Sequence, residues 1–236
     1  MIKIGCCGFC VKQEKYFQTF NVIEIQYSFY RELGIRQVNN WKKMAPAGFE
    51  FILKVPQCIT HNSTSPTYRR SDIPEEKRKY CGEFRLNEIT EAIMEKFFER
   101  AKILSATKFL FQTPASFKPT DKNIKNMINF FTYFKGRGIF LWEVRGKWDN
   151  TTVLNLCKKL NLIHATDPFI ERPQLYGDFT YYRMHGSIKT QRYSYKEEEI
   201  EKIISLSSKN GYIMFNNVYM FENALRAREI LEKSVL

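Results

Sequence analysis

Short apolar runs recur along the chain, and residues 138–148, GIFLWEVRGKW, show their pattern most fully. Positions two apart in a strand point to the same face, so Leu141, Glu143 and Arg145 share one side. The residues between them are apolar and share the other side, so both faces are apolar until the charges appear. This pattern is typical of a strand in a parallel, helix-covered sheet, where functional side chains gather at the carboxyl ends of the strands.

Eight runs of this kind alternate with helical patterns, which indicates repeated βα units. The expected strands are residues 2–5, 22–26, 49–55, 108–112, 139–144, 162–166, 180–184 and 212–215. We therefore predict the α/β class and a single (β/α)8 barrel of the TIM type over residues 1–236. An open, doubly wound sheet is the alternative. It is less favoured because the first turn reads GCCGFC and lacks the G-x-G-x-x-G fingerprint of dinucleotide binding.

The connections between the expected strands differ in regularity. Apolar residues at 124, 127, 128 and 131 form the stripe of a helix, and a last helix is expected over residues 221–231. Residues 167–178 contain two prolines and no such stripe, so we expect an irregular crossover after the sixth strand. Residues 60–83 are polar, turn-rich and basic. We expect them to lie over the barrel mouth, either as an anion-collecting lid or as a solvated loop.

Polar side chains stand at the ends of all strands but the first, and barrel closure would bring them into one ring. They are Glu24 and Gln26, Lys54 with His61 beyond it, Gln112, Glu143 and Arg145, Asp167, Arg183 and His185, and Asn216 and Asn217. Isolated charges are costly to bury, so the acidic and basic members are expected to pair. One interpretation of the ring is therefore a structural network of ion pairs that plugs the barrel.

The second interpretation is a functional site, which the histidines and amides in the ring favour. The guanidinium groups of Arg145 and Arg183 are suited to gripping phosphate or carboxylate through paired hydrogen bonds. The candidate catalytic residues are Glu24, Glu143, Asp167 and His185, which could transfer protons or support transfer. The candidate substrate-binding residues are Lys54, His61, Gln112, Arg145, Arg183 and Asn217.

The sequence identifies no cofactor. A divalent metal among the carboxylates, His61 and His185 is not favoured, because the adjacent arginines compete with a cation. His164 alternates to the opposite face from Asp167 and is expected to be a packed residue. Cys7 and Cys10 have C-x-x-C spacing, but no second pair completes a metal site.

Composition bears on the environment of the protein. Hydrophobic residues make up 44% of the 236 residues, and no apolar run approaches the roughly 20 residues of a membrane span. The chain enters a strand at once, without a secretory signal tract, so we expect a soluble, cytoplasmic protein with no membrane partner. All six cysteines are accordingly expected to be reduced.

The net charge of +12 leaves two interpretations open: a polyanionic partner such as nucleic acid, or a lysine-rich solvated surface. Together with the charged ring, it favours an enzyme acting on an anionic substrate that bears phosphate, with nucleic acid among the candidates. The alternatives are a non-catalytic nucleic-acid-binding protein and a sugar or small-acid isomerase or hydrolase. The sequence does not specify an oligomeric state.

Several phrases of the chain resemble a known family. They are IGCCGF at 4–9, IEIQYSFYR at 23–31, TH at 60–61, FQTPASF at 111–117, WEVRGKW at 142–148, YYRMHG at 181–186 and FNN at 215–217. In this order they resemble the YecE-like family, catalogued as domain of unknown function seventy-two. The resemblance implies a TIM-barrel-like fold, related in outline to endonuclease IV and sugar-isomerase barrels, with no established activity.

The family pattern carries over to Glu24, Tyr30, His61, Gln112, Glu143, Arg145, Asp167, Arg183, His185 and Asn217. The chain departs from it at the first turn, where Cys6, Cys7 and Phe9 replace threonine, serine and tryptophan, and at Gln26, where asparagine is usual. Endonuclease IV enzymes hold zinc with many histidines. This chain has three histidines, so inheritance of that mechanism is not expected.

Overall fold

The strands form a closed parallel barrel. The computed structural model describes residues 1–175, 177–187 and 190–233, and within them eight strands pair in sequence order, with the last returning to the first. They are β1 (Lys3–Cys6), β2 (Val22–Ile25), β3 (Glu50–Lys54), β4 (Lys108–Gln112), β5 (Ile139–Glu143), β6 (Leu162–Thr166), β7 (Tyr181–Met184) and β8 (Tyr212–Phe215). The predicted (β/α)8 barrel is confirmed, and every predicted strand end lies within one residue of the observed end.

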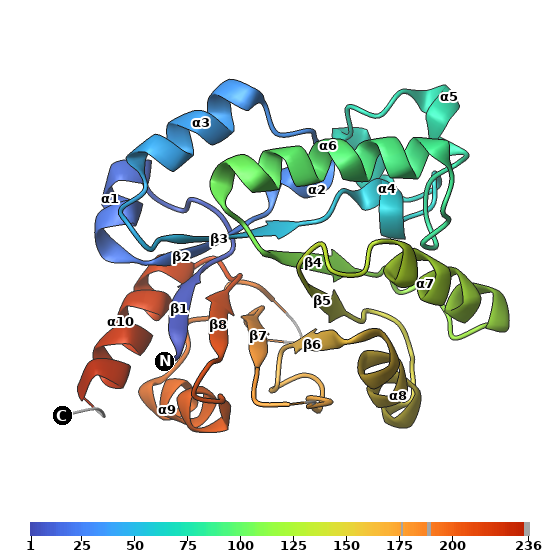
Figure 1. The fold of residues 1–236 in the computed structure, drawn as a ribbon. Helices are drawn as coiled ribbons and strands as arrows, with labels where there is room; N and C mark the ends of the chain where they lie inside the picture. The colour runs from blue at the N-terminus through green and yellow to red at the C-terminus, as the bar shows by residue number, and fades with distance from the viewer. Residues whose placement is uncertain (176, 188–189, 234–236) are drawn as a thin grey trace.

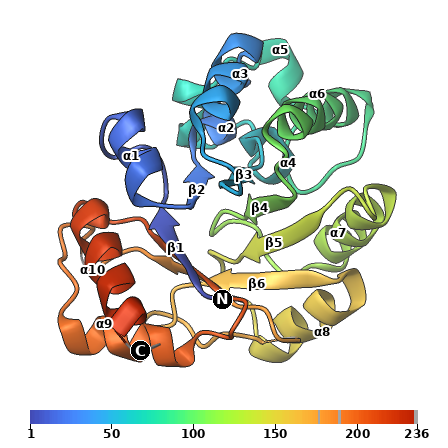
Figure 2. The same ribbon diagram turned by 60° about the vertical axis from the view of Figure 1, so that its left-hand side comes forward.

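Helices surround the barrel (Figures 1 and 2). They are α1 (Gln13–Thr19), α2 (Tyr27–Tyr30), α3 (Ile35–Met44), α4 (Gln57–Thr60), the 3-10 helix η1 (Pro66–Arg70), α5 (Glu75–Arg78), α6 (Glu88–Leu104), α7 (Asp121–Tyr133), α8 (Asn150–Leu160), α9 (Glu197–Leu206) and α10 (Met220–Lys233). The predicted last helix, 221–231, matches α10. In the part of the chain that the structure describes, no helix is long and apolar enough to cross a membrane.

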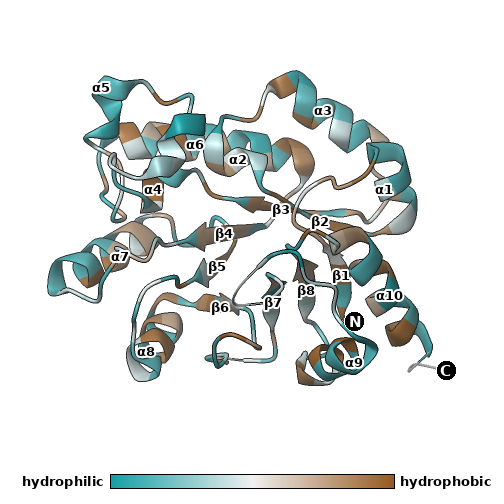
Figure 3. Ribbon diagram, turned by 180° about the vertical axis from the view of Figure 1, so that it is seen from behind, coloured by the Kyte–Doolittle hydropathy of each residue, from teal (hydrophilic) through white to brown (hydrophobic). Residues whose placement is uncertain are grey.

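Alternation along each strand separates two apolar layers. Outward residues such as Phe111 and Phe140 pack on the helices, and the ring centroids of Phe111 and Phe131 of α7 lie 4.9 Å apart. Inward residues such as Ile52, Leu110 and Leu141 fill the barrel. In Figure 3 much of strands β2 and β3 is coloured as hydrophobic, and helix α5 at the surface is coloured as hydrophilic. Glu143, on the inward side of β5, is therefore directed into the barrel.

A polar group stands at the amino-terminal end of the barrel interior. Glu50 at the start of β3 pairs with Lys3 and with Lys108, whose Nζ lies 3.2 Å from Glu50 Oε2. The hydroxyl of Tyr212 donates to the same oxygen at 2.6 Å. These contacts satisfy the charges at the floor of the barrel. The charged residues of the predicted ring lie at the opposite, carboxyl-terminal end of the strands.

The crossover between β6 and β7 is irregular, as predicted. Its described residues, 167–175 and 177–180, contain a turn but no helix; residue 176 of the predicted segment lies outside the described residues. Pro168 to Leu175 line a shallow cavity of about 690 Å³ together with Leu154 of α8, Tyr182 and Leu206 of α9. The cavity lies where a regular barrel would have a covering helix.

Residues 60–83 fold into η1 and α5 and return to the end of α4. Gly82 N donates to the carbonyl oxygen of Cys58 at 2.6 Å, and Cys58 and Cys81 are joined by a disulfide across a Cα distance of 4.6 Å. The prediction that all six cysteines are reduced is therefore wrong for this pair. The return of the segment brings together two cysteines 23 positions apart, a proximity that neither spacing nor composition predicts.

Candidate functional site

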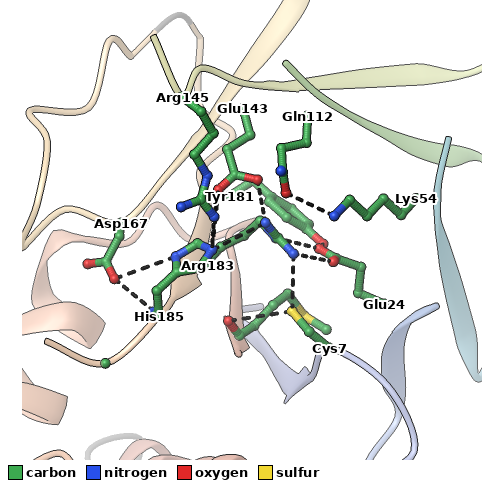
Figure 4. Close-up of polar contacts among 12 residues, drawn as sticks. Cys7, Glu24, Lys54, Gln112, Glu143, Arg145, Asp167, Tyr181, Arg183 and His185 are labelled. Atoms are coloured by element: carbon green, nitrogen blue, oxygen red, sulfur yellow. Dashed lines mark hydrogen bonds and ion pairs between the residues drawn. The ribbon is translucent and has the colours of Figure 1, made fainter. Parts of the chain in front are cut away.

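Arg183 of β7 lies at the centre of the predicted ring (Figure 4). Its side chain is 0% exposed. Nε and Nη2 donate to the two oxygens of Glu24 at 3.0 and 2.8 Å, while Nη1 donates to Oε2 of Glu143. Burial opposes the guanidinium charge, but the carboxylates of Glu143 and Glu24 hold the pKa of Arg183 well above its usual value. Arg183 thus bridges two acidic residues from opposite sides of the barrel.

Glu24 is enclosed by further donors. The hydroxyl of Tyr181 donates to Oε2 of Glu24 at 2.7 Å, and the Gln26 amide donates to Oε1. Nη2 of Arg183 lies 3.9 Å from the thiol sulfur of Cys7. Burial and the nearby Glu24 carboxylate raise the pKa of both the Tyr181 hydroxyl and the Cys7 thiol well above their usual values, so both groups stay protonated. Glu24 is fully buried and its lone pairs are occupied.

Glu143, Arg145 and His185 meet at the outer side of this cluster. Nη2 of Arg145 lies 2.8 Å from Oε1 of Glu143 and 2.6 Å from Nε2 of His185. Burial disfavours the Glu143 carboxylate, but the charges of Arg183 and Arg145 hold its pKa well below the usual range. Arg145 differs from Arg183 in being 39% exposed. It is therefore the guanidinium of the cluster that solvent reaches.

Asp167 orients His185 from the other side. Oδ2 of Asp167 accepts from the backbone N–H of His185 at 2.8 Å and lies 3.8 Å from its Nδ1, while Oδ1 accepts from Phe169 N at 3.1 Å. Guanidinium groups only donate, and Arg145 and Arg183 both face Nε2 of His185, so we assign the ring proton to Nδ1. In that tautomer the Nε2 lone pair accepts from the guanidinium groups, and Oε1 of Glu143 lies 3.3 Å from the same nitrogen.

Lys54 at the end of β3 has a different environment from the arginines. It is 5% exposed, and Nζ donates to the amide oxygens of Gln112 at 2.8 Å and Gln26 at 3.4 Å. The ammonium also lies 4.0 Å from the ring centroid of Phe29. Burial, with the charge of Arg183 next in weight, lowers the pKa of Lys54 to about 8. Gln112 thus acts here as the main partner of Lys54.

His61 lies beside this group, and Asn217 does not. His61 packs edge-on against Phe29, and Thr60 Oγ1 lies 2.8 Å from its Nδ1. Burial, then the charge of Lys54, lowers the pKa of His61 to about 4, so the imidazole is neutral. The amide of Asn217 donates instead to Tyr193 O at 2.6 Å and to Asn223 Oδ1 at 2.8 Å. These bonds connect the end of β8 to residues beyond β7 and to α10, away from the ring.

His164 is buried on the outer side of β6, as its alternation suggested. Its Nδ1 accepts from Gln174 N at 3.0 Å, and burial lowers its pKa to about 4. Among the basic residues of the 60–83 segment, Arg70 stacks on Tyr30 and Arg78 on Tyr68. These contacts stabilise the segment itself and the neighbouring α2, rather than the charge cluster.

Three residues in or near the cluster were missed in the sequence: Tyr181, Phe29 and Glu171. The signal for Tyr181 was present, because it stands two residues before Arg183 on the same face of β7. Phe29 gave no such signal, since its role depends on α2 turning back over the end of β3. Glu171 gave none either; burial, then the charge of Glu143, raises its pKa, which places it within electrostatic reach of the cluster.

Among the residues that the structure describes, no group of three or more His, Cys, Asp or Glu side chains is arranged to hold a metal ion. A cavity of about 380 Å³ lies outside the ring, between α2, α6 and the segment around Ile73 and Pro74. Its apolar lining includes Phe29, the residue that also contacts Lys54, so the cavity adjoins the Lys54 side of the cluster.

An eight-stranded βα-barrel with a charge cluster at the carboxyl ends of its strands defines the class of this protein. The chain belongs to the family described as protein of unknown function DUF72, whose model matches residues 12–235. The family expected from the sequence phrases is thereby confirmed. No curated protein matches the chain.

Solved structures share the fold over nearly the whole chain. A DUF72 family protein from Enterococcus faecalis V583 is 20% identical with a TM-score of 0.76, covering 98% of this chain and 96% of that one. One from Thermotoga maritima MSB8 is 19% identical with a TM-score of 0.68, covering 98% and 99%. A xylose isomerase domain containing protein from Salmonella typhimurium LT2 is 12% identical with a TM-score of 0.56, covering 99% and 96%. At these identities the likeness is one of fold.

Proposed function

We propose that the protein is an enzyme that binds a small anionic substrate at the barrel mouth through Arg145 and moves a proton through His185. The observation that carries the proposal is the position of Arg145, which is 39% exposed while its Nη2 contacts both Glu143 and His185. Arg183 is unsuited to the anion-binding role expected of it, since Glu24 and Glu143 already occupy its donors. Its role is to hold the two carboxylates in place.

The roles of the neighbouring groups follow from their contacts. Glu143 fixes one edge of the Arg145 guanidinium and leaves the remaining donors to face a phosphate or carboxylate. His185 faces Asp167 with Nδ1 and accepts from Arg145 at Nε2; when Arg145 turns its donors to the bound anion, Nε2 is released to act as a base beside that anion. Asp167 is a positioning residue, because both of its oxygens accept backbone N–H groups and fix the loop that carries it.

Calorimetric titration at low salt tests the anion site, with inorganic phosphate, a sugar phosphate and short DNA as ligands. We expect the small phosphates to bind and Arg145→Ala to weaken them by about tenfold or more, which corresponds to one lost charge-assisted pair. Lys147→Ala is the matched control, since it removes the same charge from an exposed residue two positions away. Its expected effect is within about twofold.

Three results would redirect the proposal. If Arg145→Ala and Lys147→Ala weaken phosphate binding equally, the effect comes from general surface charge, and the proposed anion site is wrong. Binding of DNA without any small phosphate would favour the non-catalytic nucleic-acid-binding alternative. Binding of a neutral sugar that Arg145→Ala leaves unchanged would favour the alternative of a sugar isomerase or hydrolase; one protein that shares this fold is named as a xylose isomerase domain containing protein.

A further inference from the structure

We propose that Lys54 is a nucleophile that forms an imine with the carbonyl group of the substrate. This inference rests on the proposed function: the substrate class becomes a small aldehyde or ketone that also carries a phosphate or carboxylate. Figure 4 shows Lys54 of β3 and Arg145, two residues beyond the end of β5, entering the same cluster from different sides, with Glu143 and Arg183 between them. Lys54 would bind the carbonyl carbon, and Arg145 would bind the anionic group.

The first argument is the kind of groups that contact Nζ of Lys54. Within the described residues it forms no ion pair with a carboxylate, although Glu24 and Glu143 are close enough to influence it electrostatically. Those carboxylates are engaged by Arg183. Nζ instead has two amide oxygens and an aromatic face as neighbours. A buried lysine with neutral partners loses its proton far more readily than one paired with an acid.

Lys108 provides the contrast within the same barrel. It also points inward from a strand, but it stands at the opposite end, with Nζ 3.2 Å from Glu50 and its side chain 12% exposed. Its partner is a carboxylate, whereas the hydrogen-bond partners of Lys54 are amide oxygens. Inward lysines of the same barrel therefore differ in environment: Lys108 belongs to an ion pair at the floor, and Lys54 contacts amides at the carboxyl ends of the strands.

The charges around Lys54 set its protonation. Burial and the positive charges of Arg183 and Arg145 favour the neutral amine, while Glu143 and Glu24 oppose it. His61, the remaining titratable neighbour, is itself neutral because burial and Lys54 lower its pKa to about 4. The balance leaves the pKa of Lys54 at about 8, so a substantial fraction of the amine is neutral near pH 7.

The proposed chemistry is balanced without a redox partner. The neutral Nζ attacks the carbonyl carbon, the C=O π electrons move to oxygen, and proton transfer from nitrogen gives a carbinolamine. Loss of the hydroxyl group as water, with the second hydrogen of the amine, forms the C=N bond. A solvent molecule relays these protons, and the imine then withdraws electrons from the adjacent carbon.

Reductive trapping tests the inference in the wild-type protein. The protein is incubated at pH 7 with pyruvate, dihydroxyacetone phosphate or neutral dihydroxyacetone in the presence of cyanoborohydride, and the modified lysines are mapped by mass spectrometry. We expect Lys54 to be labelled by an anionic probe at least about tenfold faster than exposed Lys147, because a pKa of about 8 leaves about a tenth of the Lys54 amine neutral at pH 7. Lys108 should remain unlabelled.

Matched variants extend the test. Lys54→Arg keeps a positive charge and should remove the fast phase of label incorporation, whereas Lys108→Arg should retain it. If the wild-type protein forms adducts at exposed lysines only and Lys54 stays unmodified, the inference is wrong. This result does not depend on whether the variants fold. If phosphate binds through Arg145 but Lys54 stays unlabelled, only this inference fails. If all three probes label Lys54 equally and Arg145→Ala has no effect, Lys54 is a nucleophile and the anion site fails.

Discussion

Arg183 determines the stability of the charge cluster, because it is the shared partner of Glu24 and Glu143. Replacing it with methionine keeps much of the volume but removes the ion pair of buried Glu24 and one of the two arginine partners of buried Glu143. We expect Arg183→Met to lower the free energy of unfolding by about 3–5 kcal/mol, measured by urea denaturation at pH 7. The triple variant with Glu24→Gln and Glu143→Gln should recover at least half of that loss. A loss below about 1 kcal/mol in Arg183→Met would contradict the bridging role.

At the same scale, alternation predicted which residues meet but not what they do. It correctly placed Glu143 with Arg145, and Arg183 with His185, on shared inward faces. It could not predict that Arg183 would be fully enclosed while Arg145 would reach solvent, since exposure depends on the lengths of the surrounding loops. The paired-charge interpretation and the site interpretation concern different parts of one cluster: Arg183 with its carboxylates is a buried ion-pair network, and Arg145 is the solvent-exposed guanidinium at which we propose that a ligand binds.

At the scale of elements, the disulfide between Cys58 and Cys81 closes the segment that contains η1 and α5. The cross-link restricts the unfolded chain, and a loop of this length contributes roughly 3 kcal/mol in the chain-entropy model. We expect the Cys58→Ser/Cys81→Ser variant to lose about that amount in urea denaturation. Cys10→Ser, at a half-buried cysteine outside the disulfide, is the control and should change stability by less than about 1 kcal/mol. An equal stability of wild-type protein with and without a thiol reductant would contradict the cross-link.

The regular elements could be predicted because each strand carries its own signal. The apolar run at residues 108–112 predicts a strand, and β4 has the same bounds. Pro168 and Pro173 likewise predicted the irregular crossover after β6. The disulfide carries no such local signal, since Cys58 and Cys81 meet only after η1 and α5 have formed and turned back. Local patterns therefore predicted the barrel, while contacts made through a long connection required the structure.

At the scale of the whole molecule, the net charge of +12 and the proposed anion site predict separable contributions to anion binding. A surface charge attracts DNA through its phosphates and releases counterions, so that affinity falls steeply with salt. In the proposed site, a guanidinium fixed by Glu143 against His185 would contact one phosphate at short range, and such a contact is screened less. We therefore expect binding of a short DNA duplex, followed by fluorescence anisotropy, to weaken by at least about tenfold between roughly 50 and 200 mM salt.

DNA binding by single-residue variants shows whether DNA binds through the surface charge or at Arg145. Arg145→Ala and Glu143→Gln should leave the DNA affinity within about twofold, because a surface-wide attraction depends little on one position. Inorganic phosphate should show the reverse behaviour, with modest salt dependence and a marked loss in Arg145→Ala. If DNA binding instead persists at the higher salt and is lost with Arg145→Ala, the duplex enters the mouth. The substrate would then be nucleic acid, and the charge of the whole surface would serve to deliver it to Arg145.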